Sequence, residues 1–69
     1  MHVSRGLLEL DLILDRFNRQ HLATLDAAKL EEFKALLALD DNDLLDLIMG
    51  RACVTDQRLA PVLGMLQAA

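Results

Sequence analysis

The chain has 69 residues, of which 54% are hydrophobic and 3% aromatic, and 11 acidic against 7 basic residues give a net charge of −4. Lys and Arg are not clustered, which argues against binding to nucleic acid or insertion at an anionic membrane surface. Leu and Ala, which favour helices, dominate, and strand-favouring residues are scarce. We therefore predict one all-α domain over residues 1–69, a compact antiparallel bundle of four to five short helices.

The first predicted helix runs from Ser4, a good N-cap residue, to Leu22. At about 100° per residue, one stripe of this helix carries the residues expected in the core, which are Leu7, Leu10, Ile13, Leu14 and Phe17. Acidic residues interrupt its apolar sequence at Glu9, Asp11 and Asp15. The segment therefore fits neither a signal peptide nor a membrane span, and we expect a cytoplasmic protein without membrane insertion.

Two further helices are predicted on either side of the polar sequence LDDND. Asp26 is the expected N-cap of the first, and Asp40 or Asp41 that of the second. Gly50 should end the second helix, because glycine readily adopts the left-handed conformation found there. The expected core positions of the two helices are Leu30, Phe33, Leu36, Leu37, Leu39, Leu44, Leu45, Leu47, Ile48 and Met49.

The last predicted helix has Thr55 as its N-cap. Its inward positions are Leu59, Val62, Leu63 and Leu66. Pro61 cannot donate a backbone hydrogen bond, so we expect a boundary or bend near it, and we expect the tail QAA to fray. Cys53 precedes this helix and is the only cysteine, which excludes an internal disulfide. We expect it to be a small buried apolar residue.

Few side chains could support catalysis. No glycine-rich phosphate loop and no pair of nucleophile and base can be recognised. His21 is expected to pack near the end of the first helix or to cap it. Asp40, Asp41 and Asp43 lack the Gly and Glu of a calcium-binding loop, so helix capping is the expected role. We predict no catalytic residue and no metal ligand, and hence no enzyme.

A second apolar pair lies off the core stripe of the first helix. Leu8 and Leu12 are four residues apart and share a side with Arg5 and Glu9. Either another helix covers this pair, or the two leucines anchor a partner protein while the flanking charges set the register. Gly6 costs a helix roughly 1 kcal/mol relative to Ala, and it fits the second interpretation because it allows close approach of another backbone.

The sequence RGLLELD, residues 5–11, resembles the RGxxE motif of the small succinate dehydrogenase assembly factors, the flavinylation factors. The likeness continues through HLATLDAAKLEEFKALLALDDNDLLDLIMGR, which is similar to that family's Leu-rich helix, polar turn and short helix ending near Gly. Many relatives have Trp where this chain has Leu47, so the packing at that position is expected to differ. The family fold is usually described as five short helices, and a break near Pro61 or in the first helix would reconcile that number with four.

The resemblance implies an assembly factor that binds the flavoprotein subunit of succinate dehydrogenase, and in some bacteria that of fumarate reductase. Such a factor would promote covalent attachment of FAD to its partner in the manner of a chaperone, without chemistry of its own. FAD would belong to the flavoprotein and would not be stably bound here. The alternative is a generic small helical interaction or regulatory module, such as an antitoxin or a helix-turn-helix relative, although the acidic charge argues against DNA.

The partner-binding residues expected from the resemblance are Arg5, Gly6, Glu9 and Asp11, to which the helical geometry adds Leu8 and Leu12.

Overall fold

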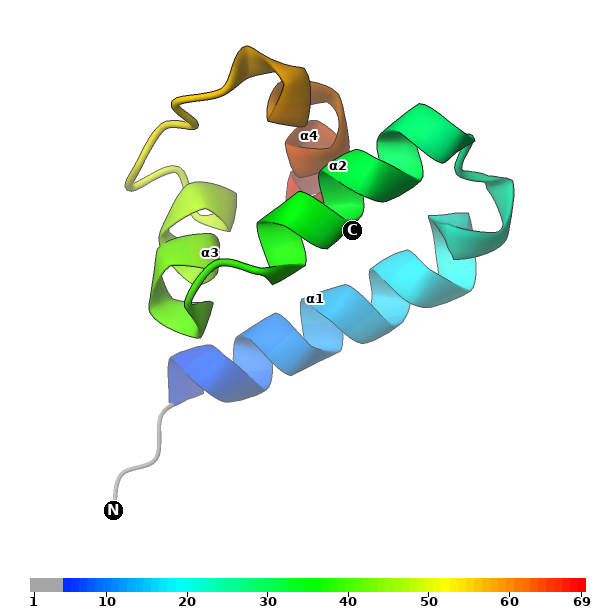
Figure 1. Ribbon diagram of the computed structural model, residues 1–69. Coiled ribbons are helices and arrows are strands. Elements are labelled where there is room, and N and C mark those ends of the chain that lie inside the picture. Colours follow the sequence, from blue (N-terminus) through cyan, green and yellow to red (C-terminus); the bar gives the residue numbers. More distant parts are fainter. Residues whose placement is uncertain (1–4) are drawn as a thin grey trace.

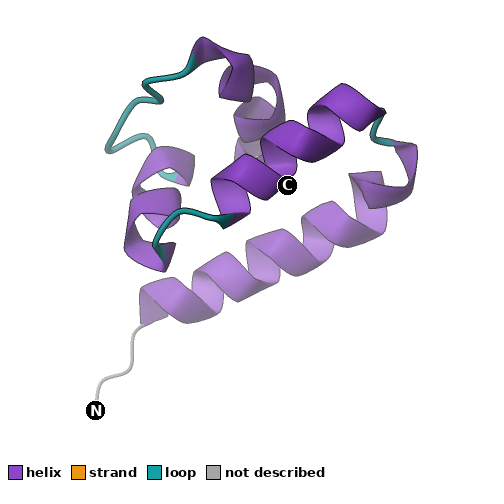
Figure 2. Cartoon of the chain, in the orientation of Figure 1, coloured by secondary structure: helices purple, strands orange, loops and turns teal. Residues whose placement is uncertain are grey.

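The computed structural model describes residues 5–69, with side chains from residue 7 onward, so the predicted N-cap Ser4 lies outside the described residues. The α-helices are α1 (Arg5–His21), α2 (Ala27–Leu37), α3 (Asp41–Ile48) and α4 (Ala60–Ala68). Two 3-10 turns, η1 (Leu22–Thr24) and η2 (Gln57–Leu59), follow α1 and precede α4. All regular structure in this part of the chain is helical (Figure 2), which confirms the predicted all-α class.

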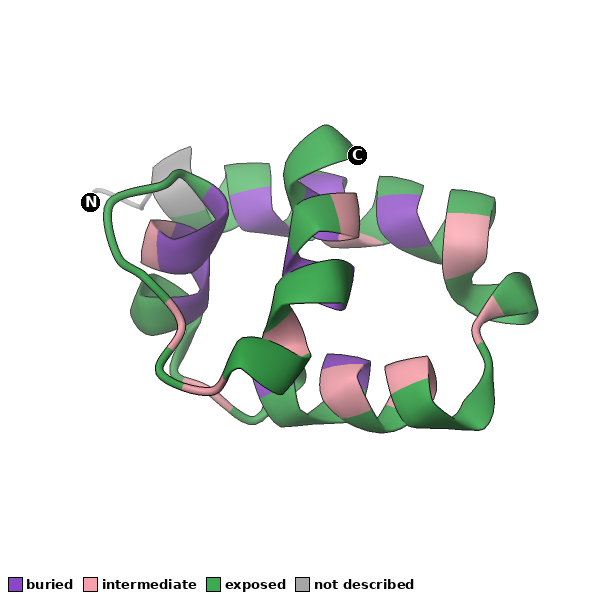
Figure 3. Ribbon diagram, turned by 90° about the horizontal axis from the view of Figure 1, so that it is seen from above, coloured by how far each residue is buried: buried purple, intermediate pink, exposed green. Residues whose placement is uncertain are grey.

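The helices enclose one core. α1 and α2 run in opposite directions along two edges of the molecule, and α4 crosses between them and packs on both (Figures 1 and 3). α3 packs against α1 and α4 and closes the end of the molecule where α1 begins. The buried residues come from all four α-helices (Figure 3), and the largest side chains that are fully enclosed are Phe17, Leu36, Leu44, Val62 and Leu66.

Aspartate side chains begin α2 and α3, as predicted. Asp26 accepts a hydrogen bond from the backbone N–H of Lys29 at 2.8 Å. Asp40 accepts one from the backbone N–H of Asn42 at 3.3 Å. Each bond satisfies an amide that has no partner within its own helix. These caps explain why both helices begin where they do.

The end of α3 is set by Gly50, which has a φ of +79°. Its N–H donates to the carbonyl of Leu47 at 3.2 Å, and the N–H of Arg51 donates to the carbonyl of Asp46 at 2.8 Å. This pair of bonds is the Schellman arrangement, which places a left-handed residue directly after a helix. The predicted role of Gly50 is therefore confirmed.

The start of the last helix differs from the prediction. Thr55 is not its N-cap; instead Asp56 caps η2 by accepting from the backbone N–H of Arg58 at 3.0 Å, and α4 begins at Ala60. Pro61 lies in the first turn of α4, where its missing N–H disturbs no helical hydrogen bond. The expected boundary near Pro61 is thus confirmed. The α-helix begins at Ala60, several residues later than a helix capped by Thr55 would begin.

Three residues assigned to the core are exposed. Leu7, Leu37 and Met49 keep 37%, 45% and 37% of their surface accessible. Leu37 follows the fully buried Leu36, and a rotation of about 100° turns it away from the core. Leu7 lies at the edge of the α1 stripe, and Met49 follows the last residue of α3. The core-facing stripe of each helix is therefore narrower than the apolar pattern indicated.

Cys53 and the C-terminal tail also differ from expectation. Cys53 is an exposed free thiol, because it lies in the irregular connection between α3 and η2 and not on the buried face of a helix. The tail continues α4 to Ala68, and the side-chain amide of Gln67 donates to the carbonyl of Leu47 at 3.2 Å. That bond ties the last turn to α3. Between residues 5 and 69, no helix combines the length and apolar character needed to cross a membrane.

Candidate partner-binding surface

Helix α1 has an inner and an outer face. Leu10, Ile13 and Phe17 are buried and attach the helix to the core. Leu8 and Leu12, here called the outer leucine pair, keep 63% and 51% of their surface accessible. Within the described part of the chain no helix covers this pair, which rules out the alternative that α3 or α4 buries it. Two large apolar side chains thus face outward side by side, one helical turn apart.

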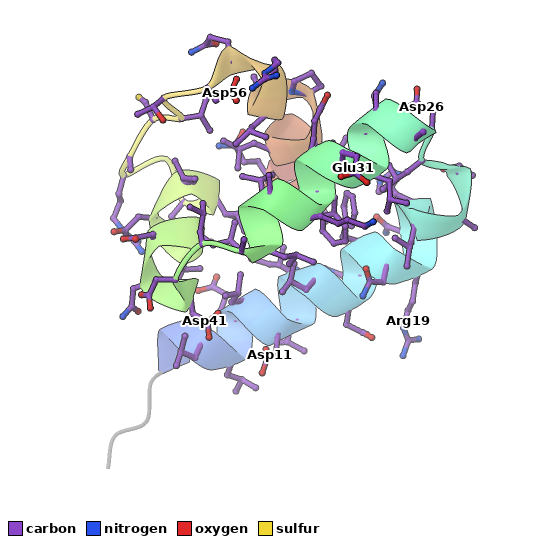
Figure 4. All side chains as sticks on the ribbon, viewed as in Figure 1. Asp11, Arg19, Asp26, Glu31, Asp41 and Asp56 are labelled. Atoms are coloured by element: carbon purple, nitrogen blue, oxygen red, sulfur yellow. The ribbon has the colours of Figure 1, made fainter. Side chains whose placement is uncertain are left out.

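Acidic residues lie on both sides of the outer leucine pair. Glu9 and Asp11 are exposed, and helical rotation places each about 60° from the nearer leucine, on opposite sides. Figure 4 shows Asp11 and Arg19 extending from the outer side of α1, away from the other helices. Arg19 pairs with Asp15 at 3.0 Å, and this solvent-exposed pair contributes little to stability. The outer face therefore combines an apolar centre with charged margins.

The first two motif residues open α1. Arg5 is the first residue of the helix, one turn before Glu9, and its side chain lies outside the described part. Gly6 precedes the buried Leu10 by one turn, and rotation places it about 60° from Glu9, on the side toward the core. The buried Leu10, Ile13 and Phe17 lie within about 40° of Gly6 around the helix axis, whereas Leu8 lies about 160° away. Gly6 therefore belongs to the core-facing side of the first turn and not to the outer face.

Two hollows open elsewhere on the molecule. One of about 240 Å³ lies between α3 and the loop that follows it, with apolar walls, two carboxylates from Asp43 and Asp46, and the thiol of Cys53. The other, of about 340 Å³, lies between α2 and η2 and is lined by acidic residues and Arg58. Across residues 7–69, no group of three or more His, Cys, Asp or Glu side chains could hold a metal ion.

The second hollow contains an ion pair that the sequence analysis missed. The guanidinium of Arg58 donates through Nη2 and Nε to the carboxylate of Asp56 at 2.9 and 3.1 Å. Side-chain hydrogen bonding to Arg58 lowers the pKa of Asp56, and the same bonding raises the pKa of Arg58. The sequence feature that could have predicted this ion pair is the Asp-x-Arg spacing of residues 56–58, just before an apolar segment. A capping aspartate leaves its second oxygen free for an arginine two residues later.

His21 packs as expected. Its ring lies against that of Phe17, with the centroids 5.3 Å apart, and the residue is half-buried at the end of α1. A histidine in that position completes the packing of the helix end.

Comparison with known proteins identifies similar chains. The family described as "Flavinator of succinate dehydrogenase" matches residues 1–69, the whole of this chain. The curated protein named "FAD assembly factor SdhE", from Pasteurella multocida (strain Pm70), is 35% identical over 63 residues, which cover 91% of this chain and 75% of that protein. No solved structure matches.

Proposed function

The chain belongs to the family of the flavinator of succinate dehydrogenase, and from this premise we propose that it binds the flavoprotein subunit of succinate dehydrogenase and promotes covalent attachment of FAD to it. The observation that carries the proposal is the outer leucine pair, which lies within and just after the RGxxE sequence and is left uncovered by the fold. Exposed apolar anchors with charged margins are typical of protein-binding surfaces.

The proposed docking surface consists of Arg5, Gly6, Leu8, Glu9, Asp11 and Leu12. Its centre is the outer leucine pair, which would enter an apolar recess of the flavoprotein. Glu9 and Asp11 would then pair with donors at the margin of that recess. Gly6, on the core-facing side of the first turn, has no side chain and would allow the partner backbone to approach the start of α1.

The proposed mechanism is selective binding. The flavoprotein would supply both the residue that becomes linked to FAD and the chemistry of the linkage. By binding the conformer in which that residue and the flavin are correctly oriented, the factor raises the population of that conformer. Holding reactants in productive geometry is enough to produce large rate effects. The factor then needs no catalytic group of its own and acts as a chaperone.

FAD is proposed to stay with the flavoprotein. The two hollows are poorly suited to it, because carboxylates of Asp43 and Asp46 face one and those of Glu31, Glu32 and Asp56 face the other. Such carboxylates would repel the pyrophosphate of a dinucleotide. Titration of the purified protein with FAD, followed by flavin fluorescence, should therefore show no saturable change, and a saturable change would contradict this part of the proposal.

The decisive experiment combines the purified protein with the FAD-free flavoprotein subunit and free FAD. Covalent incorporation is measured as flavin fluorescence of the denatured subunit, and complex formation by size-exclusion chromatography. Gly6→Leu should abolish the complex and the stimulation of flavin attachment. Normal incorporation with this variant, shown to be folded by circular dichroism, would overturn the model. The same assay with the fumarate reductase flavoprotein tests whether that subunit is a second client.

Two single substitutions separate binding from stability. Arg5→Ala and Glu9→Ala should each weaken the complex while leaving the melting temperature close to that of the unmodified protein. Glu9 is solvent-exposed and can be truncated without opening the core. A large fall in melting temperature for either variant would instead assign that residue a structural role.

A further inference from the structure

Arg16 is the one basic side chain in the described part of the chain that has no acidic partner. The chain contains seven Lys and Arg residues, and the structure describes the side chains of all except Arg5. Five of these six form ion pairs with carboxylates at 2.9–3.8 Å, namely Arg19, Lys29, Lys34, Arg51 and Arg58. Arg16 is exposed and forms none, although acids outnumber bases by 11 to 7, and residues 1–6 contain no acid that could pair with it.

The sequence of α1 explains why Arg16 stays unpaired. A helical side chain meets those three and four positions away. For Arg16 these neighbours, none of them acidic, are Leu12, Ile13, Arg19 and Gln20. Asp15 is adjacent in sequence, but rotation turns it about 100° away, and it already binds Arg19 at 3.0 Å. The guanidinium of Arg16 is therefore available to a carboxylate from another molecule.

Arg16 continues the row of the outer leucine pair. Leu8, Leu12 and Arg16 are spaced by four residues, so they follow one another along the exposed side of α1 with about 40° of rotation at each step. Arg16 lies about 60° around the axis from Arg19, which extends away from the other helices in Figure 4. Glu9 lies only about 20° from Arg16 around the axis, and about 10 Å from it along the helix. One margin of the leucine pair is thus acidic at its start and basic at its end.

We propose that Arg16 is a further residue of the α1 docking surface and that it binds a carboxylate of the flavoprotein subunit, beside the recess that takes the outer leucine pair. This inference rests on the proposed function, because the partner is the same subunit. The opposite charges of Glu9 and Arg16 fix the direction in which α1 lies on that subunit, since the reverse direction places like charges together. A guanidinium binds a carboxylate through two parallel N–H···O bonds, so Arg16 also restricts the angle of docking.

The test measures binding of the unmodified protein and its variants to the FAD-free flavoprotein subunit by calorimetry. Arg16→Glu brings a carboxylate against that of the partner and should weaken binding by about tenfold or more. Arg16→Lys keeps the charge without the paired donors, and its affinity should lie between the two. The loss in Arg16→Glu should include a slower association rate and should shrink at high salt, because charges at the rim of an interface steer the encounter.

Lys34→Glu is the matched control. It makes the same change of net charge at an exposed cation on α2, so its binding should stay close to that of the unmodified protein. Equal weakening by Lys34→Glu and Arg16→Glu would show general electrostatic attraction and would refute a specific role for Arg16. Arg16 is exposed, and a glutamate in its place can pair with Arg19, so the variant should keep its melting temperature.

The outcomes separate this inference from the proposed function. Unchanged binding of Arg16→Glu, together with weak binding of the double variant Leu8→Ser, Leu12→Ser, would overturn the role of Arg16 and leave the proposed function intact. Self-association of the free protein that Arg16→Glu abolishes, with unchanged binding to the subunit, would assign the carboxylate to a second copy and also overturn it. An unmodified protein that does not bind the subunit would refute the proposed function, and this inference with it.

Discussion

The rings of Phe17 in α1 and Phe33 in α2 pack against each other, with centroids 4.7 Å apart and planes tilted by 33°. Both side chains are buried, and they are the only phenylalanines in a chain without Trp or Tyr. α4 lies between α1 and α2 over much of their length (Figure 3). The Phe17–Phe33 contact nevertheless joins the two antiparallel helices directly. Tilted aromatic pairs at this distance add about 0.5–1.5 kcal/mol beyond the burial of their area.

Loss of this bridge should unfold much of the protein. Phe17→Ala is expected to cost about 3–5 kcal/mol, through lost burial and the cavity that remains. A core of this size rarely supplies more than about 3–5 kcal/mol of net stability. Urea unfolding followed by circular dichroism at 222 nm should therefore show little or no folded baseline for Phe17→Ala. A cooperative transition close to that of the unmodified protein would contradict the assigned role of the ring pair.

Removal of the outer leucine pair should spare stability and impair binding. The double variant Leu8→Ser, Leu12→Ser replaces side chains that already face water, so its melting temperature should fall by only a few degrees. Its binding to the flavoprotein subunit, measured by calorimetry, should weaken by tenfold or more, since apolar anchors dominate interface energy. Leu37→Ser is the matched control, as Leu37 is 45% exposed but lies on α2. Equal weakening by Leu37→Ser would argue against a specific α1 surface.

Replacing Gly50 and Gly64 with alanine should change the stability of the protein in opposite directions. An added Cβ meets no atom within 4 Å at either Gly50 or Gly64, so backbone conformation alone decides the outcome. Gly64 lies inside α4 without a positive φ, and Gly64→Ala should stabilise the protein by about 0.5–1 kcal/mol. Gly50 has a φ of +79°, and Gly50→Ala should destabilise it by about 1–2 kcal/mol. Urea unfolding of both variants measures the difference, and changes of the same sign would be inconsistent with these conformations.

Because of the Asp56–Arg58 ion pair, we expect the stability of the folded protein to depend on pH in a specific way. Hydrogen bonding from Arg58 lowers the pKa of Asp56 in the folded protein, so the folded carboxylate binds a proton less readily than the unfolded one. Its stabilising effect is complete above the ordinary aspartate pKa and is lost as the pH falls through the lowered value. Carboxylate ¹³C shifts should show Asp56 titrating at lower pH than a normal aspartate. Arg58→Gln should move that titration back upward, and an unchanged midpoint would show that Arg58 is not the cause.

Much of this protein follows from short-range patterns in its sequence. The abundance of Leu and Ala indicates helices, and Asp26, Asp40 and Gly50 mark helix ends through bonds that span only a few residues. The position of Leu8 and Leu12 off the core stripe also follows from rotation along a single helix, whereas the structure shows that no described helix covers them. These features were predictable because each depends on neighbours along the chain, and the role of the outer leucine pair in binding stays a prediction.

Other features depend on which helices meet in space. The rotation of α2 against the core decides that Leu36 is enclosed while Leu37 is exposed, although both are equally apolar. The irregular connection after α3 leaves Cys53 exposed to solvent. Because α4 begins only at Ala60, Asp56 and Arg58 lie in η2 and its cap, where they line the same hollow as Glu32. Sequence alone determined the all-α class, the caps of α2 and α3 and the family resemblance. Only the tertiary structure decided the edges of the core and the acidic hollow between α2 and η2, because burial and the walls of a hollow depend on residues distant in sequence.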